Sequence, residues 1–110
     1  MSKYLLYPGA KRELEDIWYY TKQRWGEQQA DKYIHEIDAH IQKAEARQIP
    51  WRRLPKQALL SEIDVYQIHY KRHYIFFRKL KNGGLGVMSV LHDAMDIPGR
   101  LWEILAKMDS

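Results

Sequence analysis

The side chains of this sequence best suited to chemistry are basic, and they are concentrated in its middle. Residues 47–81 carry nine basic and two acidic groups, whereas residues 1–46 and 82–110 each carry more acidic than basic groups. A positive block suits an anionic partner, either a nucleic acid or an acidic protein, although a solvated basic surface has the same composition. The cations that we expect to contact such a partner are Arg52, Arg53, Lys71, Arg72 and Arg78.

The sequence lacks the residues that several other kinds of site require. The chain has no cysteine, which removes disulfides, thiolate metal sites and cysteine nucleophiles. His35 and His40 lie in one helical segment without a spaced set of further ligands, so we predict neither a metal site nor a cofactor. The N-terminal apolar pair Leu5–Leu6 is too short for a secretory signal, and no stretch approaches the ~18 apolar residues of a membrane span. We therefore expect a soluble, cytoplasmic protein with no membrane partner.

The length and composition predict a single folded domain over residues 1–110. A chain of 110 residues has no room for a second domain. Hydrophobic residues make up 45% and charged residues 29%, so a modest core can form and disorder is not expected.

The elements that must position the basic residues begin with a strand and two helices. Residues 3–7 are strand-like, and Pro8 ends this strand at a position where proline is tolerated at a helix start. Apolar residues then recur at helical spacing between residues 10 and 25 and again between residues 30 and 44. Gly26 separates the two patterns and Pro50 closes the second, which predicts a helical hairpin.

After the hairpin the period changes to that of strands. Residues 51–56 are basic and broken by Pro55, which predicts a loop. Residues 65–70, 73–80 and 85–92 are strand-like and joined by short polar links, which predicts an antiparallel three-stranded meander. Pro98 opens a short C-terminal helix. The order βααβββα predicts an α+β domain with helices on one face of the sheet and the other face open and concave.

The tryptophans receive different predictions from their positions. Trp18 lies on the apolar face of the first helix, and Trp25 beside Gly26 is expected to fill the helix junction. Trp51 lies in the basic loop, so we expect it to be exposed and available to a partner.

Four stretches, in this order and spacing, resemble the RelE/ParE superfamily of bacterial toxin–antitoxin modules, and its ParE branch in particular. They are AKRELEDIW at residues 10–18, QRWGEQQADKY at 23–33, HYIFFRKL at 73–80 and VLHDAMD at 90–96. The resemblance implies a small cytoplasmic α+β toxin, neutralised by an antitoxin encoded beside it. ParE-type toxins act on DNA gyrase and RelE-type toxins cut mRNA on the ribosome, so the fold alone does not choose between these targets.

The ribonuclease alternative rests on Arg78 and His92, which match the positions used by the RelE branch. Metal-free RNA cleavage needs a proton donor or acceptor such as histidine and a cation that holds the phosphate. Glu62 is a further possible base. A two-residue loop, Asn82–Gly83, would place Arg78 and His92 on opposite faces of the sheet, whereas a loop of residues 82–84 would place them on one face.

Two features favour the gyrase alternative. Asp93 follows His92, and a carboxylate there repels phosphate; the segment VLHDAMD has the ParE form. On that branch no catalytic residue is expected and His92 is structural, while Arg78 contacts the target or pairs with Asp64, Asp93 or Asp96. The residues predicted to contact gyrase are Arg52, Arg53, Lys71, Arg72, Arg78, His92 and Trp102.

The antitoxin is expected to wrap the toxin with a segment that folds on binding. Tyr19, Tyr20 and Tyr33, on the helical hairpin, are the candidate contacts, although packing within the fold would equally explain them. A third hypothesis is a weakly active or decayed toxin that acts as a corepressor with its antitoxin. The sequence leaves open whether the protein forms a homodimer or a heterotetramer with the antitoxin.

Overall fold

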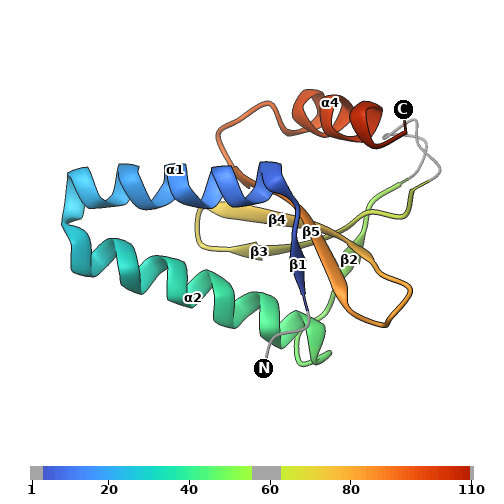
Figure 1. Cartoon of the computed structure of the whole chain (residues 1–110), viewed down its shortest axis with the longest axis horizontal. Helices are drawn as coiled ribbons and strands as arrows, with labels where there is room; N and C mark the ends of the chain where they lie inside the picture. The colour runs from blue at the N-terminus through green and yellow to red at the C-terminus, as the bar shows by residue number, and fades with distance from the viewer. Residues whose placement is uncertain (1–3, 56–62, 110) are drawn as a thin grey trace.

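The computed structural model describes residues 4–55 and 63–109, so Lys56 and Glu62 lie outside the described residues. A five-stranded sheet carries a helical hairpin on one face and a C-terminal helix on the other (Figure 1). The elements are β1 (Leu5–Leu6), α1 (Pro8–Trp25), α2 (Glu27–Glu45), β2 (Arg52–Arg53), β3 (Tyr66–Tyr70), β4 (His73–Lys79), β5 (Leu85–His92) and α4 (Ile97–Asp109).

The helical hairpin forms as the sequence predicts. Pro8 lies in the first turn of α1, where its missing N–H removes no helical hydrogen bond. Gly26 joins the helices with a φ of 93°, a conformation that strongly favours glycine, and its N–H donates to the carbonyl of Lys22. Ala30, Ile37, Ile41 and Ala44 of α2 are buried, which confirms its predicted apolar face. In α1, Ala10 is buried and Leu14 and Ile17 are half-buried against the same core, so the predicted face is confirmed only in its first part.

The sheet is mixed, with the strand order β1-β5-β4-β3-β2. The predicted meander of β3, β4 and β5 is confirmed, but β1 pairs with β5 in parallel and makes an edge strand. The predicted loop at residues 51–56 is wrong at Arg52 and Arg53, which pair with Gln67 and Tyr66. A two-residue strand is too short to show a period of two, so only its partner β3 defines it.

Both faces of the sheet are packed, so the predicted open concave face is wrong. Ile75, Phe77 and Val90 meet the hairpin on one face. Phe76, Met88 and Leu91 form a second cluster on the opposite face, which buries Leu101 and Leu105 of α4. No helix of the described chain is long and apolar enough to cross a membrane.

The register of β4 and β5 settles the relation between Arg78 and His92. Arg78 pairs with Gly86, a partner that neither of the two predicted loops would give it. A bulge after Phe76 shifts the register by one residue, so that His73 pairs with His92, as the two-residue loop predicted. Because side chains alternate along the regular strand β4, Arg78 lies on the face opposite to that of His73 and His92. Five residues of β4, roughly 16 Å at the usual strand rise, also separate Arg78 from the His73–His92 pair.

Two of the three tryptophan predictions are corrected. Trp25 is 72% exposed and does not fill the junction. Trp51 is half-buried: its ring packs edge-on against Tyr66 and Phe77, and its indole N–H donates to the carbonyl of Ala44 at 2.8 Å. Trp18 is half-buried on the hairpin, near its predicted core position.

Candidate functional site

A groove lies where the tips of α1 and α2 meet the β3–β4 turn and the segment that follows β5. It has a volume of ≈ 820 Å³. We call it the junction groove, and its residues are Asp16, Ile17, Tyr20, Thr21, Trp25, Gln29, Tyr33, Lys71, Arg72, His73, His92, Ala94 and Met95. The elements that line it lie at the end of the sheet where the two helices join, as Figure 1 shows for the helices and strands.

Exposed apolar side chains form the rim of the junction groove. Tyr20 is 61% exposed, Trp25 72% and Met95 40%. The Arg24 guanidinium carbon lies 5.0 Å from the centre of the Tyr20 ring, which adds a cation to this rim. Three large apolar side chains left open to solvent beside one groove are typical of a protein-binding surface.

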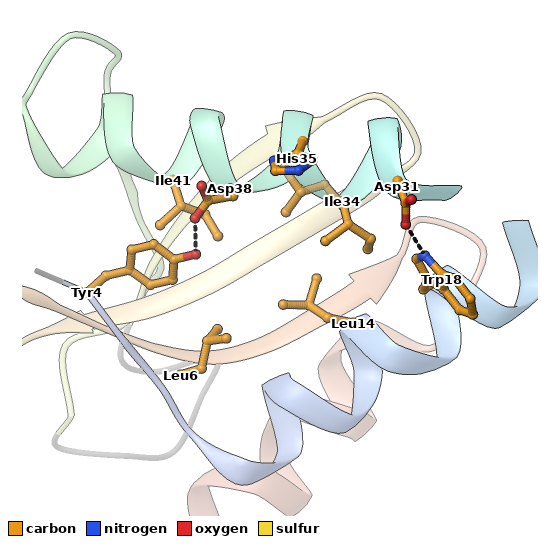
Figure 2. A pocket seen from close by; sticks show the side chains of 10 residues that line it. Tyr4, Leu6, Leu14, Trp18, Asp31, Ile34, His35, Asp38 and Ile41 are labelled. Atoms are coloured by element: carbon orange, nitrogen blue, oxygen red, sulfur yellow. Dashed lines mark hydrogen bonds between the residues drawn. The ribbon is translucent and has the colours of Figure 1, made fainter. Parts of the chain in front are cut away.

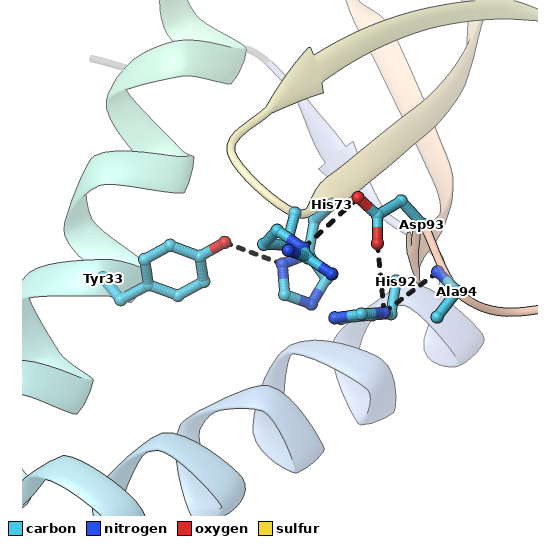
Figure 3. A network of polar contacts seen from close by, with 6 residues as sticks. Tyr33, His73, His92, Asp93 and Ala94 are labelled. Carbon is cyan, nitrogen blue, oxygen red and sulfur yellow. Dashed lines mark hydrogen bonds and ion pairs between the residues drawn. The ribbon is translucent and has the colours of Figure 1, made fainter.

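Polar contacts between Tyr33 and the β3–β4 turn form the floor of the groove (Figure 3). The Tyr33 hydroxyl accepts a hydrogen bond from the Arg72 backbone and lies 2.7 Å from His73 Nδ1. Burial raises the pKa of Tyr33 to about 12, and burial together with the nearby His92 lowers the pKa of His73 to about 4. Neutral His73 can accept the Tyr33 O–H at Nδ1, and this contact joins α2 to the start of β4 at neutral pH.

His92 stands beside His73 as its cross-strand partner, with ring centres 5.2 Å apart. Its Nδ1 accepts the backbone N–H of Ala94 at 3.0 Å and also lies 3.4 Å from Asp93 Oδ1. A nitrogen that accepts an N–H carries no proton itself, so the Ala94 bond and an ion pair with Asp93 exclude each other. The first contact is the shorter, and it joins the neutral His92 ring to the backbone after β5. Whether His92 is structural or contacts the target stays a prediction.

The two cations of the groove already have acidic partners. Arg72 Nε lies 3.3 Å from Asp93 Oδ2, and Lys71 Nζ lies 3.5 Å from Glu36 Oε1. Tyr70 and then Glu36 raise the pKa of Lys71. Asp93 therefore pairs with Arg72 and not with Arg78, among the residues that the structure describes.

Glu13 of α1 holds the C-terminal half of β5 in place beyond the end of β1. Its carboxylate accepts hydrogen bonds from the Ser89 hydroxyl at 2.8 Å and the Val90 N–H at 3.0 Å. Burial raises the pKa of this carboxyl, although both hydrogen bonds act in the opposite direction. The contact satisfies a strand edge that would otherwise be unpaired and positions the strand end that carries His92.

The groove brings together residues that the sequence analysis assigned to two different partners. Lys71, Arg72 and His92, predicted for the target, lie beside Tyr20 and Tyr33, predicted for the antitoxin.

The remaining predicted contacts lie elsewhere. Tyr19 is exposed on α1 outside the groove lining, and Trp102 is 48% exposed on α4. Arg52 and Arg53 lie on the edge strand β2. Arg78 lies on the other face of the sheet.

Two groove residues, His73 and Met95, were not singled out from the sequence, although Met95 lies within the segment from His92 to Trp102 that was predicted to contact the target. A histidine within a strand pattern has the same spacing as a core residue, so the sequence did not mark His73 as a site residue. Its only link to the site was the pairing with His92 that the two-residue loop predicted. Met95 follows the last strand without a periodic neighbour. Within residues 4–55 and 63–109, no group of three or more His, Asp or Glu side chains could hold a metal ion.

A second pocket, of ≈ 320 Å³, lies inside the hairpin between α1, α2 and β1 (Figure 2). Leu6, Leu14 and Ile34 point into it. Hydrogen bonds close its two ends: the Trp18 indole donates to Asp31 at 2.8 Å, and the hydroxyl of Tyr4 donates to Asp38. These bonds tie the helices to each other and to the first strand, so the pocket serves the packing of the hairpin.

Comparison with known proteins connects this geometry to one family. A sequence model described as "ParE toxin of type II toxin-antitoxin system, parDE" matches residues 4–97. The chain is 33% identical over 100 residues to Toxin ParE1 of Mycobacterium tuberculosis, which covers 91% of this chain and 98% of that protein. It is 27% identical over 101 residues to Toxin ParE of Escherichia coli, covering 92% and 94% of the two chains. Toxin ParE1 of Caulobacter vibrioides is 48% identical over 42 residues, covering 38% and 44%.

Proposed function

The chain belongs to the ParE toxin family of type II toxin–antitoxin systems, and from this premise we propose that it inhibits DNA gyrase by binding it and that a cognate antitoxin neutralises it. The supporting observation is that cationic and aromatic candidates for both partners line one groove. A partner seated on Tyr20 and Tyr33 would cover Lys71, Arg72 and His92. Neutralisation is then competition for the junction groove.

The groove favours an antitoxin segment that is both apolar and acidic. Trp25, Tyr20 and Met95 offer apolar area, and burying a large aromatic ring contributes strongly to binding. Lys71 and Arg72 offer charge, although their ion pairs with Glu36 and Asp93 must be shared with the incoming carboxylates. A segment that folds on binding places such side chains at spaced positions along a groove.

The placement of Arg78 disfavours the ribonuclease alternative in the form that the sequence offered. Arg78 and His92 lie on opposite faces of the sheet, with roughly 16 Å of strand between Arg78 and the His73–His92 pair, so they cannot hold one phosphate. In addition, His92 Nδ1 is occupied by the Ala94 N–H. These contacts support binding as the mode of action and gyrase as the target.

A paired assay tests the proposal. The purified chain is added to gyrase and relaxed plasmid, and in parallel to ribosomes translating an mRNA. We expect loss of supercoiling with intact mRNA, and restored supercoiling when antitoxin is added. Cleaved mRNA with normal supercoiling would overturn the proposal in favour of the ribonuclease.

Matched charge reversals locate the contact. Arg72→Glu changes the groove, while Arg78→Glu makes the same charge change on the opposite face of the sheet. We expect Arg72→Glu to weaken both gyrase inhibition and antitoxin binding, with Arg78→Glu close to the parent chain. Equal effects of the two reversals would remove the groove from the mechanism. If neither activity is found but the antitoxin still binds, the corepressor hypothesis replaces the toxin.

A further inference from the structure

A second basic surface lies at the end of the sheet opposite the junction groove. Strand β4 begins with His73 at the groove and ends six residues later with Lys79, roughly 20 Å away at the usual strand rise. Figure 1 shows β2 and the β4–β5 turn at this end, far from the helix junction. We call this surface the sheet-end patch, and it consists of the exposed residues Arg47, Arg53, Lys79 and Lys81. Arg52 pairs with Gln67 and leaves the sheet on the other face.

Aromatic rings gather the charges of the sheet-end patch. The Arg47 guanidinium carbon lies 3.5 Å from the centre of the Trp51 ring, and Lys79 Nζ lies 5.9 Å from the same centre. Lys79 Nζ is also 5.3 Å from the centre of the Tyr66 ring. Arg53 is the cross-strand partner of Tyr66, so its side chain leaves the sheet on the same face. Cations far apart in the sequence therefore meet around two rings.

The charges of the sheet-end patch are not neutralised within the described part of the chain. None of its four cations has an ion pair there, whereas Lys71 and Arg72 at the groove both do. Among nearby acidic groups, Asp64 is exposed just before β3, and the half-buried Glu45 acts on Tyr4 beside β1. Among the described residues, two acidic groups against four cations leave an exposed positive surface.

The backbone fixes one of these cations in an unusual way. α2 ends with the Arg47 N–H donating to the Ala44 carbonyl and the Gln48 N–H donating to the Lys43 carbonyl, a Schellman motif. The residue at the left-handed position of that motif is usually glycine, but here it is Arg47, with a φ of 61°. The side chain is thus held over Trp51 by the helix end, so little of its freedom remains to be lost on binding.

We propose that the sheet-end patch binds the phosphate backbone of duplex DNA without reading its sequence. Four exposed cations match the dense charge of a duplex. Single-stranded nucleic acid needs open aromatic faces on which bases stack, and Arg47 covers the face of Trp51. Within the described residues, the patch presents ends of elements and short strands, which fit a backbone better than they fit a base-reading groove. The surface is separate from the junction groove and adds to the proposed function without resting on it.

Fluorescence anisotropy tests the proposed DNA binding. A labelled duplex of about 24 base pairs and mixed sequence is titrated with the protein at a series of KCl concentrations. The full-length chain is compared with Arg53→Gln/Lys79→Gln and with Lys71→Gln/Arg72→Gln, which removes the same charge at the groove. All substituted residues are exposed, and thermal melting confirms that each variant is folded. In the patch variant, the slope of log K against log[KCl] should become shallower by about 2, because each lost phosphate contact removes about one unit of slope. The affinity of this variant for the duplex at low salt should fall ~10-fold or more.

The groove variant should keep the slope of the parent chain and bind within about twofold of it. Equal losses in the two variants would overturn the proposal, since binding would then follow net charge alone. Tighter binding of single-stranded DNA or of RNA, or no duplex binding at low salt, would also overturn it. Antitoxin affinity measured on the same variants should fall only for Lys71→Gln/Arg72→Gln, so that failure at one surface is distinguished from failure at the other.

Discussion

The two ends of the sheet carry the same residue types in opposite electrostatic states. At the junction groove, Lys71 and Arg72 pair with Glu36 and Asp93. At the sheet-end patch, no cation has such a partner among the described residues, and the Arg47 guanidinium stacks on a ring instead. A basic block that is continuous in the sequence is thus divided by the length of β3 and β4 into two surfaces with different chemistry.

The surroundings of each surface match this difference. The junction groove is recessed and rimmed by Trp25, Tyr20 and Met95, so a partner there gains mainly from apolar burial. At the sheet-end patch the large ring, Trp51, is packed into the fold and only charge is offered outward. Protein recognition is expected at the first surface and phosphate recognition at the second.

The largest effect is expected from truncating the tryptophan at the sheet end. Trp51→Ala removes packing against Tyr66 and Phe77 and the bond to the Ala44 carbonyl. We expect the free energy of unfolding to fall by about 3 kcal/mol, the low end for a tryptophan because the ring is half-buried. Urea denaturation measures it, with Trp25→Ala as the control because that ring is 72% exposed. Comparable losses in both variants would erase the distinction between the two ends.

The pH dependence of stability gives the next largest effect and belongs to the groove end. Burial lowers the pKa of His73 to about 4 from its ordinary 6.5, so the unfolded chain takes up a proton at a higher pH than the folded chain. Stability from this group is complete above pH 6.5 and is lost as the pH falls from 6.5 towards 4, by about 3 kcal/mol.

His73→Gln provides the matched variant, since its side-chain carbonyl can still accept the Tyr33 hydroxyl. Carboxyl groups titrate in both proteins, so the difference between the two urea-denaturation curves isolates His73. That difference should shrink steadily from pH 6.5 to pH 4. A constant difference would mean that His73 is not held neutral by its place beneath the groove.

The third effect concerns binding at the groove rim. Trp25→Ala removes an exposed ring from the junction groove and should weaken antitoxin binding ~30-fold, about 2 kcal/mol, with an unchanged melting temperature. Trp102→Ala truncates another exposed tryptophan, on α4, and should change antitoxin affinity less than about twofold. Titration calorimetry with the antitoxin measures both. Greater sensitivity at Trp102 would move the antitoxin site from the groove to α4.

The sequence predicts the elements of this fold well because their periods are strong. The hairpin, the three meander strands and the C-terminal helix each bury a continuous stripe, and a stripe is visible in the residue order. The parallel pairing of β1 and the edge strand Arg52–Arg53 depend on which strand lies beside them, and two residues show no period. The docking of α4 on Phe76 and Leu91 is likewise a contact between distant segments.

The candidate site is harder to predict for two physical reasons. α1 has 18 residues, about 27 Å, and it extends past the sheet, so Trp25 keeps the helical spacing of a core residue while lying in solvent. The bulge after Phe76 changes the register by one residue, and this shift decides whether Arg78 and His92 lie on the same face of the sheet. The groove forms only when the helix tips, the β3–β4 turn and the end of β5 come together, and residue spacing carries no sign of that.

The smallest effect concerns a feature that the two ends share. Lys71, with a φ of 52°, and Arg47, with a φ of 61°, are the non-glycine residues with left-handed backbone in the described structure. An alanine at either position keeps the strain, whereas a glycine relieves it. We therefore expect each glycine variant to be more stable than the matching alanine variant by about 1 kcal/mol, against the usual order of these residues.

The two positions should differ in how glycine compares with the parent residue. Arg47→Gly loses the stacking on Trp51, worth about 0.5–1 kcal/mol, so the relief of strain is largely offset. Lys71→Gly loses an exposed ion pair with Glu36 and longer cation–π contacts with the Tyr33 and Tyr70 rings, at 5.8 and 5.4 Å. These contacts contribute little at an exposed site, so this variant should stabilise the chain slightly. Urea denaturation of the four variants measures these differences. If Arg47→Gly gained as much as Lys71→Gly, the stacked guanidinium would contribute nothing to the fold, and the positioning of Arg47 at the sheet-end patch would serve binding alone.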